Sequence, residues 1–113
     1  MKTFYVDGLG MNVLGSFENH AGFDGIMLGL PSYTWHLEFT YQHGVKIERA
    51  LSKEHLLVFY FGDSSEWNEA VEKLKKCGAI EVKPENPYWD SPKAATFEDP
   101  EGWRVILCNG KWP

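Results

Sequence analysis

The chain has 113 residues, which suits one folded domain and leaves no room for a second. Its 11 basic and 16 acidic residues give a net charge of −5 without a basic run, which argues against a nucleic-acid partner. Two cysteines exclude a disulfide framework, and there is neither the ~20-residue apolar run of a membrane helix nor a signal peptide. These features predict a cytosolic protein of one domain that does not bind membranes.

The first half of the chain predicts a short helix followed by strands. Residues 3–7 read as a helical stub that ends at a Gly-Leu-Gly break. Shorter strand candidates follow at residues 13–17 and 26–30. Residues 35–41 alternate apolar and polar side chains with a period of two, which predicts a strand with one apolar and one polar face.

The second half predicts a strand, a long helix and further strands. Residues 55–61 are apolar on both faces, which predicts a buried strand. Residues 63–77 predict a helix, because apolar residues recur at three- and four-residue steps and Asp63 and Gly78 suit its two ends. The remaining strand candidates are short: residues 80–83, 95–98 and 104–108. The turn sequence Asp-Pro-Glu-Gly joins the last two as a hairpin.

The two halves of the chain are weakly related to each other. Residues 54–113 read as strand, helix and three strands, whereas residues 1–44 read as helix and three strands. The order of elements therefore predicts an α+β fold of two modules. The second module is βαβββ, and the first lacks its opening strand.

Two motifs lie near opposite ends of the chain. Residues 4–11 read Phe-Tyr-Val-Asp-Gly-Leu-Gly-Met, and residues 98–103 read Glu-Asp-Pro-Glu-Gly-Trp. They resemble the FY-x-x-x-LG-M and EDP-x-G-aromatic signatures of the glyoxalase/bleomycin-resistance/extradiol-dioxygenase superfamily, which has the vicinal oxygen chelate fold. Residues 23–31, 36–40 and 86–89 are similar to a bacterial glyoxalase-like subgroup. The resemblance implies paired βαβββ modules that curl into a partly open barrel, with the ligand on the concave face, and homodimers in many members.

The resemblance also implies where a metal would bind. In the metalloenzymes of the superfamily, the first and last strands of each module give one ligand each. Carried over by motif, Glu38 and His55 hold two of these positions, and a divalent ion accepts both residue types. Ile106 holds the third position and cannot bind a metal, while the strand that would carry the fourth is absent.

Each candidate residue also has an ordinary structural interpretation. Glu38 fits the solvated face of an antiparallel strand, and His55 fits a hydrogen-bonded strand edge. Phe59 shares a strand face with His55, which places both on the expected concave face. Trp89 lies in an Asn-Pro-Tyr-Trp turn and is either packed within that turn or part of the cavity wall. The predicted ligand-binding set is Glu38, His55, Phe59, Trp89 and Ile106.

Two functions are consistent with these residues. The first is a small-molecule-binding domain without a complete metal site, which Ile106 favours because it suits a hydrophobic pocket. The alternative is a metal-dependent enzyme of glyoxalase or dioxygenase type, in which Glu38 and His55 help to hold a divalent Lewis acid. The sequence favours the first and leaves open whether the chain is an enzyme. We also expect a second copy of the chain to cover the edge left by the missing strand.

Overall fold

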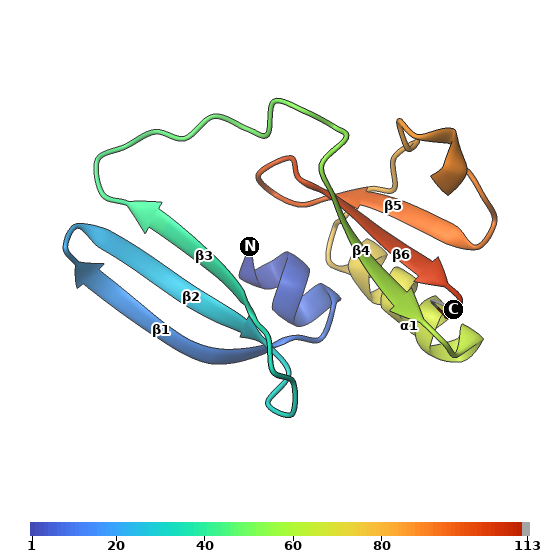
Figure 1. Cartoon of the computed structure of the whole chain (residues 1–113), viewed down its shortest axis with the longest axis horizontal. Coiled ribbons are helices and arrows are strands. Elements are labelled where there is room, and N and C mark those ends of the chain that lie inside the picture. The colour runs from blue at the N-terminus through green and yellow to red at the C-terminus, as the bar shows by residue number, and fades with distance from the viewer. Residues whose placement is uncertain (112–113) are drawn as a thin grey trace. The chain divides into compact units, whose positions relative to one another are not determined.

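A computed structural model describes residues 1–111 and confirms an α+β fold with two three-stranded sheets (Figure 1). The chain forms two compact units. Residues 10–47 make one, called here the strand unit. Residues 1–9 and the described residues from 48 onward make the other, called the mixed unit. That the chain is one domain, divided at 1–44 and 54–113, stays a prediction. No helix within residues 1–111 has the length and apolar character to cross a membrane.

The strand unit is an antiparallel sheet of three strands in chain order (Figure 1). The strands are β1 (Asn12–His20), β2 (Phe23–Gly29) and β3 (Leu37–Gln42). They confirm the three strands predicted for the first half, and β1 is longer than expected. Leu28 of β2 is fully buried, whereas Trp35, which precedes β3, is 47% exposed.

The mixed unit contains β4 (Leu56–Phe61), α1 (Ser64–Lys76), β5 (Ala94–Glu98) and β6 (Arg104–Asn109). The strand order is β4-β6-β5, with β4 parallel and β5 antiparallel to the central β6. The order strand, helix, strands agrees with the second module predicted from the sequence, but only two of its three final strands form within residues 1–111. The predicted helix is confirmed to within one residue at each end, and Asp63 caps it by accepting a hydrogen bond from the Ser65 N–H at 2.8 Å.

Two expectations for the mixed unit are wrong. The predicted strand at residues 80–83 is reduced to a single bridge between Glu81 and Phe97. Pro84 follows immediately and has no N–H to continue a ladder. The segment 55–61 is not fully buried, because β6 is the only strand that pairs with β4 within residues 1–111 and β4 therefore lies at a sheet edge.

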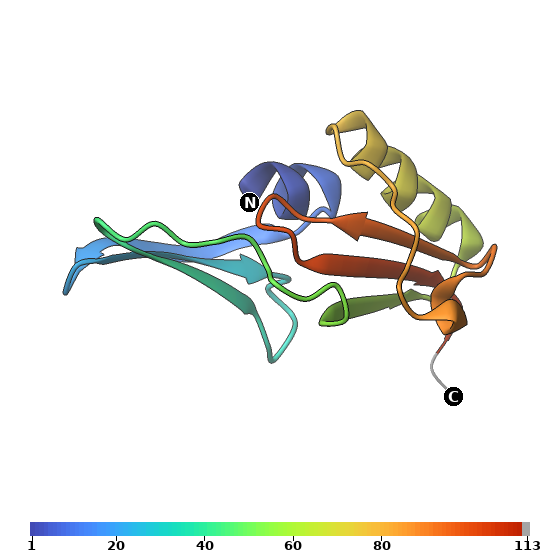
Figure 2. The same cartoon turned by 90° about the horizontal axis from the view of Figure 1, so that it is seen from above.

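The register of the mixed sheet assigns its side chains to two faces. Neighbours across paired strands point the same way, and successive residues alternate. Helix α1 packs on the face that carries Val105 and Leu107, and the indole N–H of Trp67 donates to the Leu107 carbonyl at 2.9 Å. Figure 2 shows α1 on one side of this sheet and η2 (Pro87–Trp89), in orange, on the other. The side of the sheet opposite α1 is therefore the candidate side for ligand binding.

The short helix η1 (Thr3–Gly8) confirms the predicted helical stub and packs against α1. Gly8 permits this close approach, because a Cβ at this position would lie 2.5 Å from Leu74 Cδ2 and one of the two would have to shift. Leu74 is fully buried. The amino-terminal segment is thus part of the core of the mixed unit, although the strand unit separates it in sequence from the rest.

Candidate functional site: a cavity opposite α1

A cavity of about 260 Å³ lies on the face of the mixed sheet opposite α1. Its floor consists of residues from all three strands, and its wall comes from residues 84–89. The floor residues are Leu56, Thr96, Arg104 and Ile106. The volume is just below the roughly 300–1,000 Å³ of pockets for drug-sized ligands, so the cavity suits a smaller molecule.

Strand register brings the floor residues together. Leu56 of β4 pairs with Arg104 of β6, and Thr96 of β5 pairs with Ile106 of β6. All four therefore point to the same face. Ile106 is completely buried and Thr96 is only 2% exposed. Within residues 1–111 the buried Thr96 Oγ has no hydrogen-bond partner.

The wall of the cavity is fixed by a side-chain cap. Asn86 Oδ1 accepts a hydrogen bond from the Tyr88 N–H at 3.0 Å, and Pro87 at the first helical position has the fixed φ that a helical turn needs. The Trp89 N–H donates to the Asn86 carbonyl, also at 3.0 Å. The Tyr88 and Trp89 rings meet edge-to-face with centroids 4.9 Å apart. These contacts hold Trp89 half-buried at the cavity.

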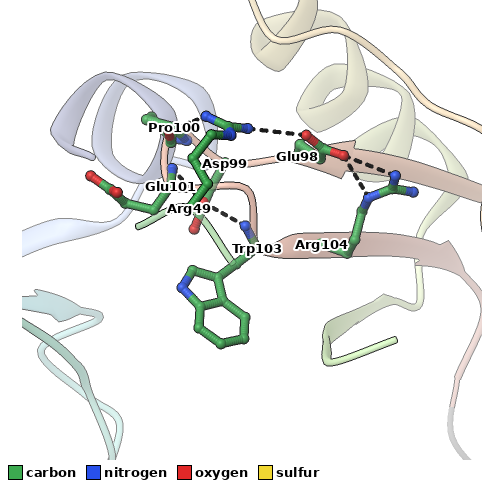
Figure 3. Close-up of polar contacts among 7 residues, drawn as sticks. All are labelled: Arg49, Glu98, Asp99, Pro100, Glu101, Trp103 and Arg104. Carbon is green, nitrogen blue, oxygen red and sulfur yellow. Dashed lines mark hydrogen bonds and ion pairs between the residues drawn. The ribbon is translucent and has the colours of Figure 1, made fainter. Parts of the chain in front are cut away.

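The charged groups at the cavity are balanced. Arg104 is 4% exposed and donates from Nε to Glu98 Oε2 at 2.9 Å, and Nη2 lies 2.8 Å from the same oxygen. Arg49 Nη2 donates to the other oxygen of Glu98 at 3.2 Å, so this carboxylate lies between two guanidinium groups (Figure 3). The remaining charged lining residues are Lys53, Glu54 and Glu85.

Trp89 and Ile106, both predicted from the sequence, line this cavity. Glu54 and Leu56 also line it, whereas the ring of His55 between them meets Trp103 with centroids 6.1 Å apart.

Two other predicted residues lie elsewhere. Phe59 pairs with Leu107 and points to the α1 side, so it does not share a face with Ile106. Glu38 belongs to the strand unit, where it pairs with Met27 and its Oε2 lies 3.7 Å from His36 Nε2.

Sequence reasoning missed Thr96 and Arg104. The signal was present, because the Asp-Pro-Glu-Gly turn at residues 99–102 fixes the register of the two strands that flank it. That register pairs Thr96 with Ile106 and Glu98 with Arg104. A residue predicted to line a pocket therefore identifies its cross-strand partner as a second candidate.

Comparison with known proteins identifies the family. The models of the YycE-like N-terminal domain and the YycE-like C-terminal domain match residues 1–40 and 54–109. The chain belongs to the YycE-like family. It is 44% identical over 108 residues to the uncharacterized protein YycE of Bacillus subtilis (strain 168), covering 96% of this chain and 77% of YycE.

Solved structures confirm the vicinal oxygen chelate fold of this YycE-like chain. A crystal structure of YycE from Bacillus subtilis, whose description suggests a glyoxalase or fosfomycin-resistance protein, matches with a TM-score of 0.89 and 41% identity. The match covers 99% of this chain and 81% of that one. A glyoxylase/bleomycin resistance protein/dioxygenase domain from Frankia sp. EAN1pec matches at 0.72 with 15% identity, over 96% and 84% of the two chains. The fosfomycin resistance protein FosX from Listeria monocytogenes, in complex with Mn(II) and sulfate, matches at 0.61 with 15% identity, over 97% and 78%.

The two signature motifs of this YycE-like chain bind each other. The Tyr5 hydroxyl of the first motif donates to Asp99 Oδ2 of the second at 2.7 Å. Asp99 Oδ1 accepts from the backbone N–H groups of Glu101 at 2.9 Å and Trp103 at 3.0 Å. Burial, followed by the bond to Asp99 and the repulsion by its charge, raises the pKa of the Tyr5 hydroxyl above its ordinary value. These motifs therefore hold the mixed unit together.

The described part of the YycE-like chain does not gather the side chains that usually hold a divalent ion. Within residues 1–111 no group of three or more His, Cys, Asp or Glu side chains is placed to hold a metal. Ile106, which the resemblance implies would hold a ligand position, has a hydrocarbon side chain that is completely buried. Stable protein metal sites supply three or four donor groups.

Proposed function

We propose that the chain is a cytoplasmic small-molecule-binding domain of the glyoxalase/bleomycin-resistance type, with its ligand in the cavity opposite α1. The observation that carries the proposal is a concave site in which apolar and polar side chains converge. Leu56 and Ile106 are the apolar part of its floor, Thr96 and Arg104 are the polar part, and Trp89 is an aromatic residue of its wall. Apolar and aromatic surface with a few well-placed polar groups is what orients a small ligand.

The site supports binding more directly than it supports a reaction. Arg104 is paired with Glu98, which satisfies its charge without a ligand. The binding roles of Glu38, His55 and Phe59 stay predictions. The alternative function, a metal-dependent enzyme, is tested by elemental analysis of the purified protein. If the protein contains a stoichiometric divalent metal, the metal-dependent enzyme is favoured and the metal-free binding domain is rejected.

Titration of the full chain with toluene tests the binding proposal. We expect saturable NMR shifts at the Ile106 methyl groups and the Trp89 indole N–H. Trp89→Ala removes the aromatic part of the wall and should weaken binding by about fivefold or more, because burial of an aromatic face is worth about 1–3 kcal/mol. Tyr33→Ala is the control, because Tyr33 is 53% exposed and lies in the strand unit. Shifts that are absent, or that survive Trp89→Ala, would contradict the proposal.

We also propose that the chain is a homodimer. Within residues 1–111, β3 pairs only with β2, so one edge of the strand-unit sheet carries unpaired backbone groups. Trp35 and Tyr41 are 47% and 51% exposed in the same unit. Sedimentation at micromolar concentration tests this, and a monomer would contradict it.

A further inference from the structure

We propose that the ligand of this cavity is a neutral molecule with an apolar body and one oxygen group that hydrogen-bonds to Thr96 Oγ. The inference rests on the proposed function and adds the chemical class of the ligand. It assigns a recognition role to a residue that neither family motif contains.

The first argument is the unpaired hydroxyl. Thr96 is 2% exposed, and its Oγ has no hydrogen-bond partner within residues 1–111. A buried hydroxyl without a partner lowers stability, whereas a valine would fill the same volume without that cost. A polar residue at this position of a cavity floor is explained if a ligand supplies the missing partner. A hydroxyl both donates and accepts, so a phenol, an alcohol or a carbonyl would serve.

The second argument is charge. The lining includes two cationic side chains, Lys53 and Arg104, and two carboxylates, Glu54 and Glu85. Arg104 is already paired with Glu98, so an anionic ligand would have to compete with that carboxylate. A cationic ligand would lie near the same guanidinium. A neutral ligand avoids both costs.

The third argument is size and shape. The cavity holds about 260 Å³, and an apolar cavity of roughly 150 Å³ is enough for benzene. A single substituted ring therefore fits. The half-buried Trp89 and the buried Ile106 provide apolar contacts for the ring while Thr96 meets its oxygen.

Phenol and toluene test the inference, because they differ by a hydroxyl in place of a methyl group. Each is titrated into the full chain and into three variants, with binding followed at the Ile106 methyl groups. Thr96→Val should weaken phenol binding by about 5–10-fold and leave toluene binding unchanged. It should also raise the melting temperature without ligand. Thr96→Ser keeps the hydroxyl and should keep the preference for phenol. Thr40→Val, at an exposed position of β3, should change none of these.

The outcomes separate the two proposals. If phenol and toluene bind in the cavity and Thr96→Val leaves phenol affinity unchanged, the role of Thr96 is refuted and the binding domain stands. If neither probe shifts the cavity signals, both proposals fail. A Thr96→Val variant with a lower melting temperature, or one that does not fold, would show that the hydroxyl is already satisfied and would overturn the inference. Loss of the phenol preference in Thr96→Ser would do the same.

Discussion

Removing the hydroxyl of Tyr5 should destabilise the whole mixed unit. In Tyr5→Phe, Asp99 Oδ2 loses the hydrogen bond that it accepts at 2.7 Å, and Asp99 is 2% exposed. A hydrogen bond to a charged group contributes about 1.5–3 kcal/mol. At roughly 4 °C per kcal/mol for a domain near this size, the melting temperature should fall by roughly 6–12 °C.

Thermal and urea unfolding measure this loss, with Tyr33→Phe as the control because Tyr33 is 53% exposed. Tyr33→Phe should change stability by less than about 0.5 kcal/mol. Equal losses in the two variants would refute the reasoning, since the Tyr5 contact would then contribute no more than an exposed hydroxyl.

The effect should depend on pH in one direction. The pKa of Tyr5 is raised in the folded state above the ordinary value of 10.0. The folded state therefore favours the protonated Tyr5 hydroxyl. Its contribution to the free energy of unfolding is complete below pH 10 and declines above pH 10, where the unfolded chain loses the proton and the folded chain does not. Tyr5→Phe has no hydroxyl to titrate. The difference in free energy of unfolding between the wild type and this variant should therefore shrink by about 1.4 kcal/mol from pH 9 to pH 11. An unchanged deficit would contradict the assignment.

Three further results are expected. Gly8→Ala should lower the free energy of unfolding by about 1–3 kcal/mol, because the new Cβ overpacks against Leu74. Gly110→Ala is the control and should be nearly neutral, because its Cβ would meet nothing within 4 Å. Urea unfolding compares the two variants. Glu98→Gln should cost about 2–4 kcal/mol in the same assay, since it leaves the buried Arg104 guanidinium without its counter-charge, and a loss below about 1 kcal/mol would contradict this. Manganese(II) or zinc at about 100 µM should shift the melting temperature by less than about 2 °C, and a larger shift would revive the metalloenzyme.

Local signals predicted most of the fold. Each signal for α1 lies in the helix or next to its ends: Asp63 caps its start, an amphipathic repeat runs through it and Gly78 follows it. Its bounds were therefore predicted closely. The prediction of a strand at residues 80–83 was wrong for an equally local reason, because the proline that follows the segment cannot continue a ladder. The exposure of β4 could not be read from its own residues, because an edge position depends on which strands pair with it.

The candidate site was predicted only in part for the same reason. Trp89 and Ile106 come from motifs and line the cavity. Whether Phe59 and Ile106 point to the same face of the sheet depends on the parallel register of β4 and β6, which are about fifty residues apart in the sequence. A register shift of one residue would reverse the answer. Thr96 becomes a candidate only when its cross-strand partner is known.

The mixed unit is built from two segments that are far apart in the sequence, and this has a consequence during protein synthesis. Tyr5 and Asp99 are 94 residues apart, and the strand unit is made between them. At about 5–20 residues per second, a ribosome needs roughly 5–20 s to reach the second partner after making the first. Phe4 and Tyr5 are both buried in the folded protein. During this interval they have no covering surface, because the later residues of the mixed unit have not yet been made. The strand unit can begin to form its hairpins on the ribosome, whereas the mixed unit must wait until the final hairpin has emerged.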